Sequence, residues 1–173
     1  AEAAHDLGRA CAIHAYSNEG IRRAVLAGID NIEHGCMMTE DLIEEMARRG
    51  THLNPTMTGI RGAAKAGPNA KYWDMLQERV FSKQEQGMRW AKQAGILIGA
   101  GTDTAGTLRD EIAMIGETLG EGPVEALGHE CEILDYYVNQ ENALFRRPTG
   151  PAALAADAHT TLHYQALKRR QQR

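Results

Sequence analysis

Apolar and polar positions follow a pattern that recurs four times between residues 1 and 103. In each repeat a helical pattern ends at a glycine, a short strand-like run follows, and a polar residue stands at the far end of that run. The four glycines are Gly8, Gly28, Gly50 and Gly95. Glycine there permits the left-handed turn with which many helices end. Helices that alternate with strands predict an α/β fold with parallel strands.

The same pattern predicts where the individual elements lie. Strands are expected over residues 10–13, 29–33, 51–54 and 96–101. Ser17 and Thr39 precede two amphipathic segments, so they are the expected N-caps of two helices. A longer helix is predicted over residues 72–94, where large apolar residues recur at helical spacing.

The polar residues at the ends of the four runs are the candidates for chemistry. They are His14, His34, Asn54 with Thr56, and Asp103. The carboxyl ends of parallel strands share one edge, where ligands bind in such folds. Two imidazoles and a carboxylate are a donor set that suits zinc, and Asp103 is placed to accept a proton from the attacking water. The spacing is equally compatible with hydrogen-bonded strand-end residues that bind nothing.

Three local sequences at these ends are more specific. Residues 13–16 (Ile-His-Ala-Tyr), 32–35 (Ile-Glu-His-Gly) and 101–106 (Gly-Thr-Asp-Thr-Ala-Gly) resemble three strand-end motifs of the amidohydrolase superfamily, in particular its imidazolonepropionase-like and prolidase-like members. The connecting segments resemble the same family in the same order, over about residues 1–128. The resemblance implies a (β/α)8 barrel of which this chain holds strands five to eight with their helices.

The resemblance also implies roles for particular residues. His14 matches the metal ligand of strand five, His34 the histidine of strand six, and Asp103 the aspartate of strand eight that binds metal and activates water. The expected activity is metal-dependent hydrolysis of a C–N bond, in an amide or a cyclic amide, through a metal-activated water. The expected cofactor is a divalent metal, zinc in the first place.

Three further positions are expected to face the substrate. Tyr16 resembles a residue that faces the substrate carbonyl in relatives, and Asn54 and Thr56 fall where relatives line the pocket. The expected substrate is a small amide or a dipeptide-like molecule. Cys36 follows close behind His34, which makes it a candidate nucleophile, but most such cysteines are passive, so no catalytic role is expected.

Two ligand sets of the family are missing from the chain. Neither the His-x-His pair of the first strand nor the lysine of strand four is present. A closed barrel takes about 250 residues, more than the 173 of this chain. Half a barrel has two open sheet edges, which favour pairing with another chain. The alternative to an enzyme is therefore a catalytically inactive half barrel that self-associates into a homo-oligomer.

The end of the chain differs from the part before it. Residues 146–173 hold six Arg or Lys and one Asp, although the whole chain has a formal net charge of −4. The family likeness also stops near residue 128. We expect two parts, 1–128 as the half barrel and 129–173 as an atypical tail, and hypothesise a reading-frame shift, a gene-fusion boundary or a disordered segment. The basic cluster has no aromatic stacking partners, so no nucleic acid is expected.

Composition limits the setting in which the protein works. No run approaches about 18 apolar residues, so no membrane span is predicted. The first residues lack the pattern of a signal peptide. Cys11, Cys36 and Cys131 are widely spaced and form no CxxC pair, which excludes a disulfide framework and a zinc knuckle. We therefore expect a cytoplasmic protein.

Overall fold

The structure is a computed structural model that describes residues 1–66, 68, 70–103, 105–122 and 125–128. The chain divides into two compact units, Ala1–Val138 and Asn139–Arg173. The strands, the helices and the candidate site residues lie in the first unit. The predictions for the tail over 129–173 lie outside the described residues, and the boundary at residue 128 stays a prediction.

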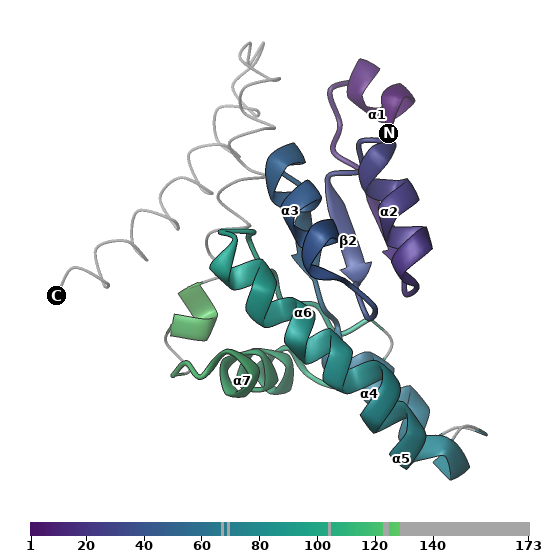
Figure 1. Cartoon of the computed structure of the whole chain (residues 1–173). Coiled ribbons are helices and arrows are strands. Elements are labelled where there is room, and N and C mark those ends of the chain that lie inside the picture. The colour runs from purple at the N-terminus through teal and green to yellow at the C-terminus, as the bar shows by residue number, and fades with distance from the viewer. Residues whose placement is uncertain (67, 69, 104, 123–124, 129–173) are drawn as a thin grey trace, which may run out of the picture. The chain divides into compact units, whose positions relative to one another are not determined.

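A small parallel sheet lies at the centre of the first unit. Its strands are β1 (Ala12–Ala15), β2 (Asn31–His34) and β3 (His52–Asn54), in the order β1-β2-β3. Two rows of residues cross it: Ile13, Ile32 and Leu53 are paired in register, as are His14, Glu33 and Asn54. The predicted α/β class with parallel strands is confirmed, and the bounds of the first three predicted strands lie within two residues of the observed ones. Figure 1 shows β2 between α2 and α3.

The fourth predicted strand, over 96–101, is wrong as an element. Of this run only Ile98 forms a β-bridge, with Leu53 of β3 and in the parallel sense. The Leu53 N–H donates to the Leu97 carbonyl and the Gly99 N–H donates to the Leu53 carbonyl, at 3.1 and 2.8 Å. Glycine is a poor strand residue, and Gly99 and Gly101 limit the pairing to this one bridge. The run still places the following loop beside β3.

Helices connect the strands and follow the last of them. They are α1 (Glu2–Asp6), α2 (Asn18–Leu26), α3 (Glu40–Arg49), α4 (Met57–Ala66), α5 (Trp73–Leu76), α6 (Ser82–Gln93) and α7 (Leu108–Leu119). The sequence pattern does not predict α4, because Gly59 and Gly62 lower its intrinsic helix propensity.

The long helix predicted over 72–94 is helical but irregular. A 3₁₀ turn over Ala70–Tyr72 precedes α5, and a π-helical turn over Gln77–Phe81 joins α5 to α6. Phe81 at the end of that turn is buried, and its ring lies 5.6 Å from that of Trp73. Large apolar residues therefore mark the helical segment correctly, whereas their spacing does not reveal the wider turn.

The predicted helix ends are mostly confirmed. Gly8, Gly28, Gly50 and Gly95 all have left-handed backbone conformations, with φ between 65° and 80°. The Ser17 hydroxyl caps α2 by accepting a hydrogen bond from the Gly20 N–H at 3.1 Å. Thr39 occupies the N-cap of α3 but makes no cap hydrogen bond: its hydroxyl accepts from Asn18 Nδ2 at 2.9 Å and donates to Asp41 Oδ1 at 2.6 Å.

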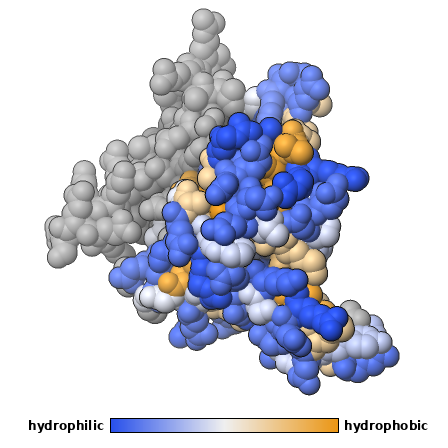
Figure 2. Space-filling model, in the orientation of Figure 1, coloured by the Kyte–Doolittle hydropathy of each residue, from blue (hydrophilic) through white to orange (hydrophobic). Residues whose placement is uncertain are grey.

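The core lies between the sheet and the helices. α2 packs against α3, α3 against α6, and α6 against both α7 and the π turn. Fully buried side chains from the strands and helices fill the space between them: Ile21, Val25, Ile32, Leu42, Met46, Leu53, Met57 and Met88. The face drawn in Figure 2 is mainly hydrophilic with small apolar patches, as expected for the outer faces of amphipathic helices. No helix within the described part of the chain is long and apolar enough to cross a membrane.

Candidate metal centre and its surroundings

The structure brings three of the predicted site residues together. His14 lies in β1, His34 is the last residue of β2, and Asp103 lies in the loop after the Ile98 bridge. One ligand atom of each lies within 4.8 Å of those of the other two. His34 is buried, whereas His14 and Asp103 are exposed. The carboxyl edge of the sheet thus gathers side chains that are 20 to 89 residues apart in sequence.

The backbone at this edge is held in an uncommon conformation. Among the described residues, the non-glycine residues with positive φ are His34 (77°), Thr56 (47°) and Asp103 (57°). Left-handed backbone costs a non-glycine residue about 1–2 kcal/mol, and strained backbone of this kind clusters at functional sites. All three are residues that the sequence marked as candidates. Their shared conformation therefore supports a functional edge.

Hydrogen bonds fix the tautomer of His34. The Thr56 hydroxyl donates its one hydrogen to the Pro55 carbonyl at 2.8 Å, so its oxygen can only accept from His34 Nδ1, 2.5 Å away. A neutral His34 therefore carries its hydrogen on Nδ1 and has a lone pair on Nε2. That Nε2 lies 2.6 Å from His14 Nδ1. Metal-binding histidines are commonly oriented in this way through their second nitrogen.

The donor set fits a divalent cation. Burial and the neighbouring His14 lower the pKa of His34, so its imidazole is neutral at neutral pH and can act as a ligand. The 2.6 Å separation of the two ring nitrogens is that of a hydrogen bond. A divalent cation at this site would be held by His14 Nδ1, His34 Nε2 and the Asp103 carboxylate.

Tyr16 lies against this group of donors. Its ring stacks on that of His34, with the centroids 4.3 Å apart and the planes 19° from parallel. Burial, Cys36 and Asp103 raise the pKa of Tyr16, so the phenol keeps its hydrogen at neutral pH. The side chain is half exposed. Tyr16 can therefore donate a hydrogen bond to a molecule bound at the edge.

Asn54 follows on the neighbouring strand. Its Oδ1 is buried and accepts no hydrogen bond from the described part of the chain. Its side chain also hydrogen bonds to Glu33, whose pKa is raised by burial. A Cβ at Gly101 would lie 2.6 Å from Asn54 Nδ2, so glycine is needed for the loop to pass this close. Asn54 Oδ1 is therefore enclosed beside the loop that leads to Asp103.

Gln84 of α6 is a residue that sequence reasoning missed. It is fully buried, and its amide nitrogen donates to the carbonyls of His34 and Pro55, both at 2.8 Å. It thereby holds the backbone at the ends of β2 and β3, where His34 and Thr56 have positive φ values. The signal was a polar residue at helical spacing between buried Phe81 and Met88.

Glu111 of α7 was missed as well. It is fully buried, and its carboxylate accepts hydrogen bonds from the backbone N–H groups of Met57 and Thr58 and from the Thr58 hydroxyl, all at 2.7 Å. It thus anchors the residues that directly follow Thr56. Gly59 in the next turn has no room for a side chain, because a Cβ would lie 2.1 Å from the Thr102 carbonyl oxygen. α4 therefore lies directly against the loop of Asp103.

Cys36 is not suited to nucleophilic chemistry. Its side chain is buried, and burial raises its pKa to about 12, against the small opposing effect of Arg61. At pH 8 only about one molecule in 10⁴ carries the thiolate. We expect iodoacetamide to alkylate Cys11 in the native chain at pH 8 and to leave Cys36 unmodified, as read by peptide mass spectrometry.

Denaturation provides the control for this labelling. In guanidinium chloride both thiols are exposed, so Cys36 is expected to react at a rate comparable with that of Cys11. Alkylation of native Cys36 as fast as that of Cys11 would contradict the burial and the raised pKa.

Comparison with known proteins shows where this arrangement recurs. The sequence model of the amidohydrolase family matches residues 1–140. Uncharacterized proteins of Mycobacterium tuberculosis and Mycobacterium bovis are 30% identical over 138 residues, which is 75% of this chain and 37% of theirs. An ochratoxinase of A. niger is 27% identical with a TM-score of 0.64, over 75% of this chain and 30% of that protein.

Two further solved structures are similar. A Xaa-Pro dipeptidase with methionine in its active site is 27% identical with a TM-score of 0.65, over 81% of this chain and 36% of its own. A prolidase complexed with N-methylphosphonate-L-proline is 25% identical with a TM-score of 0.64, over 80% of this chain and 35% of its own. The chain spans about a third of the length of the proteins it matches. With the family match running through both strand-end histidines and Asp103, the chain belongs to the amidohydrolase family.

Proposed function

We propose that the chain supplies half of the active site of a metal-dependent hydrolase that cleaves the C–N bond of an amide or dipeptide-like substrate. The convergence of His14, His34 and Asp103 at one edge of a parallel sheet carries this proposal. In this proposal β1, β2 and β3 are strands five to seven of a (β/α)8 barrel, and the bridge at Ile98 marks the eighth.

The donors have separate tasks. His14 Nδ1 and His34 Nε2 hold the cation, which we expect to be zinc, and Thr56 keeps His34 in the required tautomer. A bound divalent cation lowers the pKa of a water and polarises a carbonyl. The exposed Asp103 carboxylate is an additional ligand and accepts the proton of the attacking water. The proton then passes to the leaving nitrogen as the C–N bond breaks.

Neighbouring residues orient the substrate. The protonated phenol of Tyr16 donates to the carbonyl of the scissile amide, and Asn54 lines the pocket at the end of β3. The Thr56 hydroxyl is engaged with His34 and Pro55, so we assign Thr56 to positioning His34, in place of the direct substrate contact expected from the sequence. A dipeptide-like substrate is favoured because similar structures include a dipeptidase and a prolidase.

The test combines metal analysis with an activity screen. The chain, alone and extended by any coding sequence upstream of Ala1, is stripped with a chelator and offered dipeptides with and without a C-terminal proline. We expect hydrolysis to need added Zn²⁺ and to vanish again with the chelator. Hydrolysis that is equal before and after metal removal would contradict the proposed role of the cation.

One observation favours the alternative of a self-associating half barrel. β1 forms an edge of the sheet among the described strands, and its residues Ala12, Ile13 and His14 are exposed. Ile13 of this edge strand is 39% exposed, and an open strand edge that carries an apolar residue favours pairing with another chain. Sedimentation of the chain at several concentrations, with metal content and hydrolysis measured on the same samples, distinguishes the two. A metal-free, inactive oligomer supports the alternative, and a metal-loaded hydrolase supports the enzyme.

A further inference from the structure

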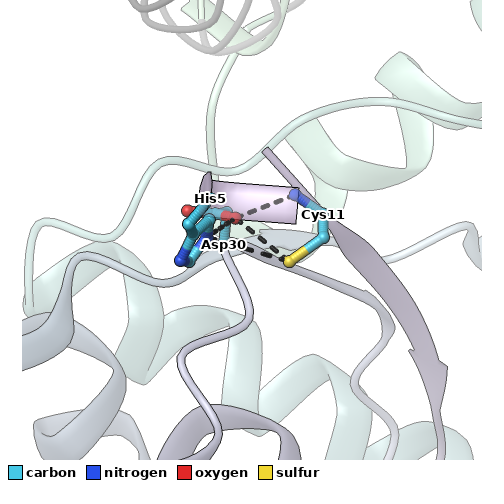
Figure 3. A group of neighbouring side chains, drawn as sticks. All are labelled: His5, Cys11 and Asp30. Carbon is cyan, nitrogen blue, oxygen red and sulfur yellow. Dashed lines mark hydrogen bonds and ion pairs between the residues drawn. The ribbon is translucent and has the colours of Figure 1, made fainter. Parts of the chain in front are cut away.

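A second group of metal-ligating side chains lies at the opposite edge of the sheet. Cys11 directly precedes β1 and Asp30 directly precedes β2, so both stand at the amino ends of strands whose carboxyl ends carry His14 and His34. His5 reaches this edge from α1 (Figure 3). Nothing in the proposed reaction uses these three residues.

The three side chains converge through one ligand atom each. His5 Nε2 lies 2.8 Å from Asp30 Oδ2, Cys11 Sγ lies 3.3 Å from the same oxygen, and Cys11 Sγ lies 3.9 Å from His5 Nε2. The backbone N–H of Cys11 also donates to Asp30 Oδ2, at 2.8 Å. Burial raises the pKa of Asp30, but the hydrogen bonds from His5 and Cys11 outweigh it, so the net pKa is lowered and the carboxyl is ionised at neutral pH.

This geometry does not suit a catalytic triad. In a Cys-His-Asp triad the histidine faces the thiol with one nitrogen and the carboxylate with the other. Here His5 presents the same Nε2 to both Cys11 and Asp30. Three side chains that each turn one metal-ligating atom toward the other two are instead an arrangement that suits a bound cation.

We propose that His5, Cys11 and Asp30 form a second metal site, which binds a borderline divalent cation such as Zn²⁺. Zinc bonds to imidazole, thiolate and carboxylate are about 2.0–2.3 Å long, which places tetrahedral ligand atoms about 3.3–3.6 Å apart. Of the three observed separations, 3.3 Å lies at the lower limit of that range, 2.8 Å lies below it and 3.9 Å lies above it. Small side-chain shifts therefore suffice to admit the ion.

The chemistry of the donors selects the class of cation. A thiolate and an imidazole favour Zn²⁺ or Co²⁺ over Mg²⁺ or Ca²⁺, which take oxygen ligands. Binding converts the Cys11 thiol to a thiolate, and its proton goes to solvent. The His5 and Asp30 side chains are 44% and 24% exposed, so water can complete the coordination. The bound ion would join α1 to the starts of β1 and β2.

Cobalt reports this site selectively, because a thiolate ligand produces a charge-transfer band in the near ultraviolet that nitrogen and oxygen ligands do not. The full chain is titrated with Co²⁺ under reducing conditions. We expect the band to saturate between one and two equivalents, because the group of His14, His34 and Asp103 also takes up the ion without contributing to the band. We expect the band to be lost in Cys11→Ser and to persist in Cys36→Ser and Cys131→Ser. Asp103→Asn, which alters the other donor group, is expected to leave the band unchanged.

A second variant keeps the test informative if Cys11→Ser folds poorly. His5→Gln alters a side chain that is 44% exposed, and we expect Co²⁺ to bind at least about tenfold more weakly there, with unchanged circular dichroism. Zn²⁺ is expected to protect Cys11 of the native chain from iodoacetamide, and Mg²⁺ is not. A band that is absent from the wild-type chain, survives in Cys11→Ser or has the same affinity in His5→Gln would overturn the proposal and leave only a hydrogen-bonded cluster.

Discussion

Replacing Asp103 with asparagine is expected to lower kcat for amide hydrolysis by a factor of about 10³, within the 10²–10⁴ range typical of a lost general base. Asparagine keeps the size of the side chain and one oxygen, but it cannot accept the proton of the attacking water. KM is expected to change much less, because Tyr16 and Asn54 are unaltered. Steady-state kinetics at saturating Zn²⁺ measure both constants.

The matched control is Asp74→Asn, which makes the same chemical change at an exposed aspartate of α5. It is expected to leave kcat and KM unchanged. Metal content is measured on the same samples, so that a loss of cation can be separated from a loss of the proton acceptor. Full activity in Asp103→Asn would remove the proposed role of Asp103 and leave the metal ligands to be sought elsewhere.

The clustering of the candidate site could be predicted because parallel strands align their carboxyl ends. Once the glycine-strand pattern was recognised, the residues after each strand had to share one edge. His14, His34 and Asp103 do so although they lie on three separate segments. The left-handed glycines were predictable for the same local reason, since a helix that turns directly into a strand needs that conformation.

The contacts that hold this edge could not be predicted, because they depend on which helix faces which loop. Gln84 reaches two carbonyls from a helix 50 residues after His34. The tautomer of His34 follows from a hydroxyl 22 residues away. The single bridge at Ile98 depends on how far β3 extends, and the pattern of apolar residues around Ile98 does not encode that.

The cluster of His5, Cys11 and Asp30 was missed for a related reason. The prediction rests on the carboxyl ends of the strands alone. The same parallel register also brings Cys11 and Asp30 together at the amino ends. His5 comes from a five-residue helix that the register does not place. A sequence reading that considered both ends of each strand could have found two of the three residues.

Replacing Glu111 with alanine is expected to lower the free energy of unfolding by about 4 kcal/mol, because it leaves buried polar groups without a partner at about 1–3 kcal/mol each. The groups are the N–H donors of Met57 and Thr58 and the Thr58 hydroxyl. Burial raises the pKa of Glu111, and the hydrogen bonds from Met57 and Thr58, which favour the carboxylate, offset this only in part. Chemical denaturation followed by circular dichroism measures the loss.

Two variants separate the lost hydrogen bonds from other effects of shortening the side chain. Glu117→Ala makes the same change at an exposed position of α7 and is expected to alter the free energy of unfolding by less than about 0.5 kcal/mol. Glu111→Gln keeps one acceptor oxygen but turns an NH₂ group toward a donor, so an intermediate loss is expected. Because Met57 and Thr58 directly follow Thr56, Glu111→Ala should also weaken metal binding through His34. A loss no larger than that of Glu117→Ala would mean that the Glu111 carboxylate does not anchor the start of α4.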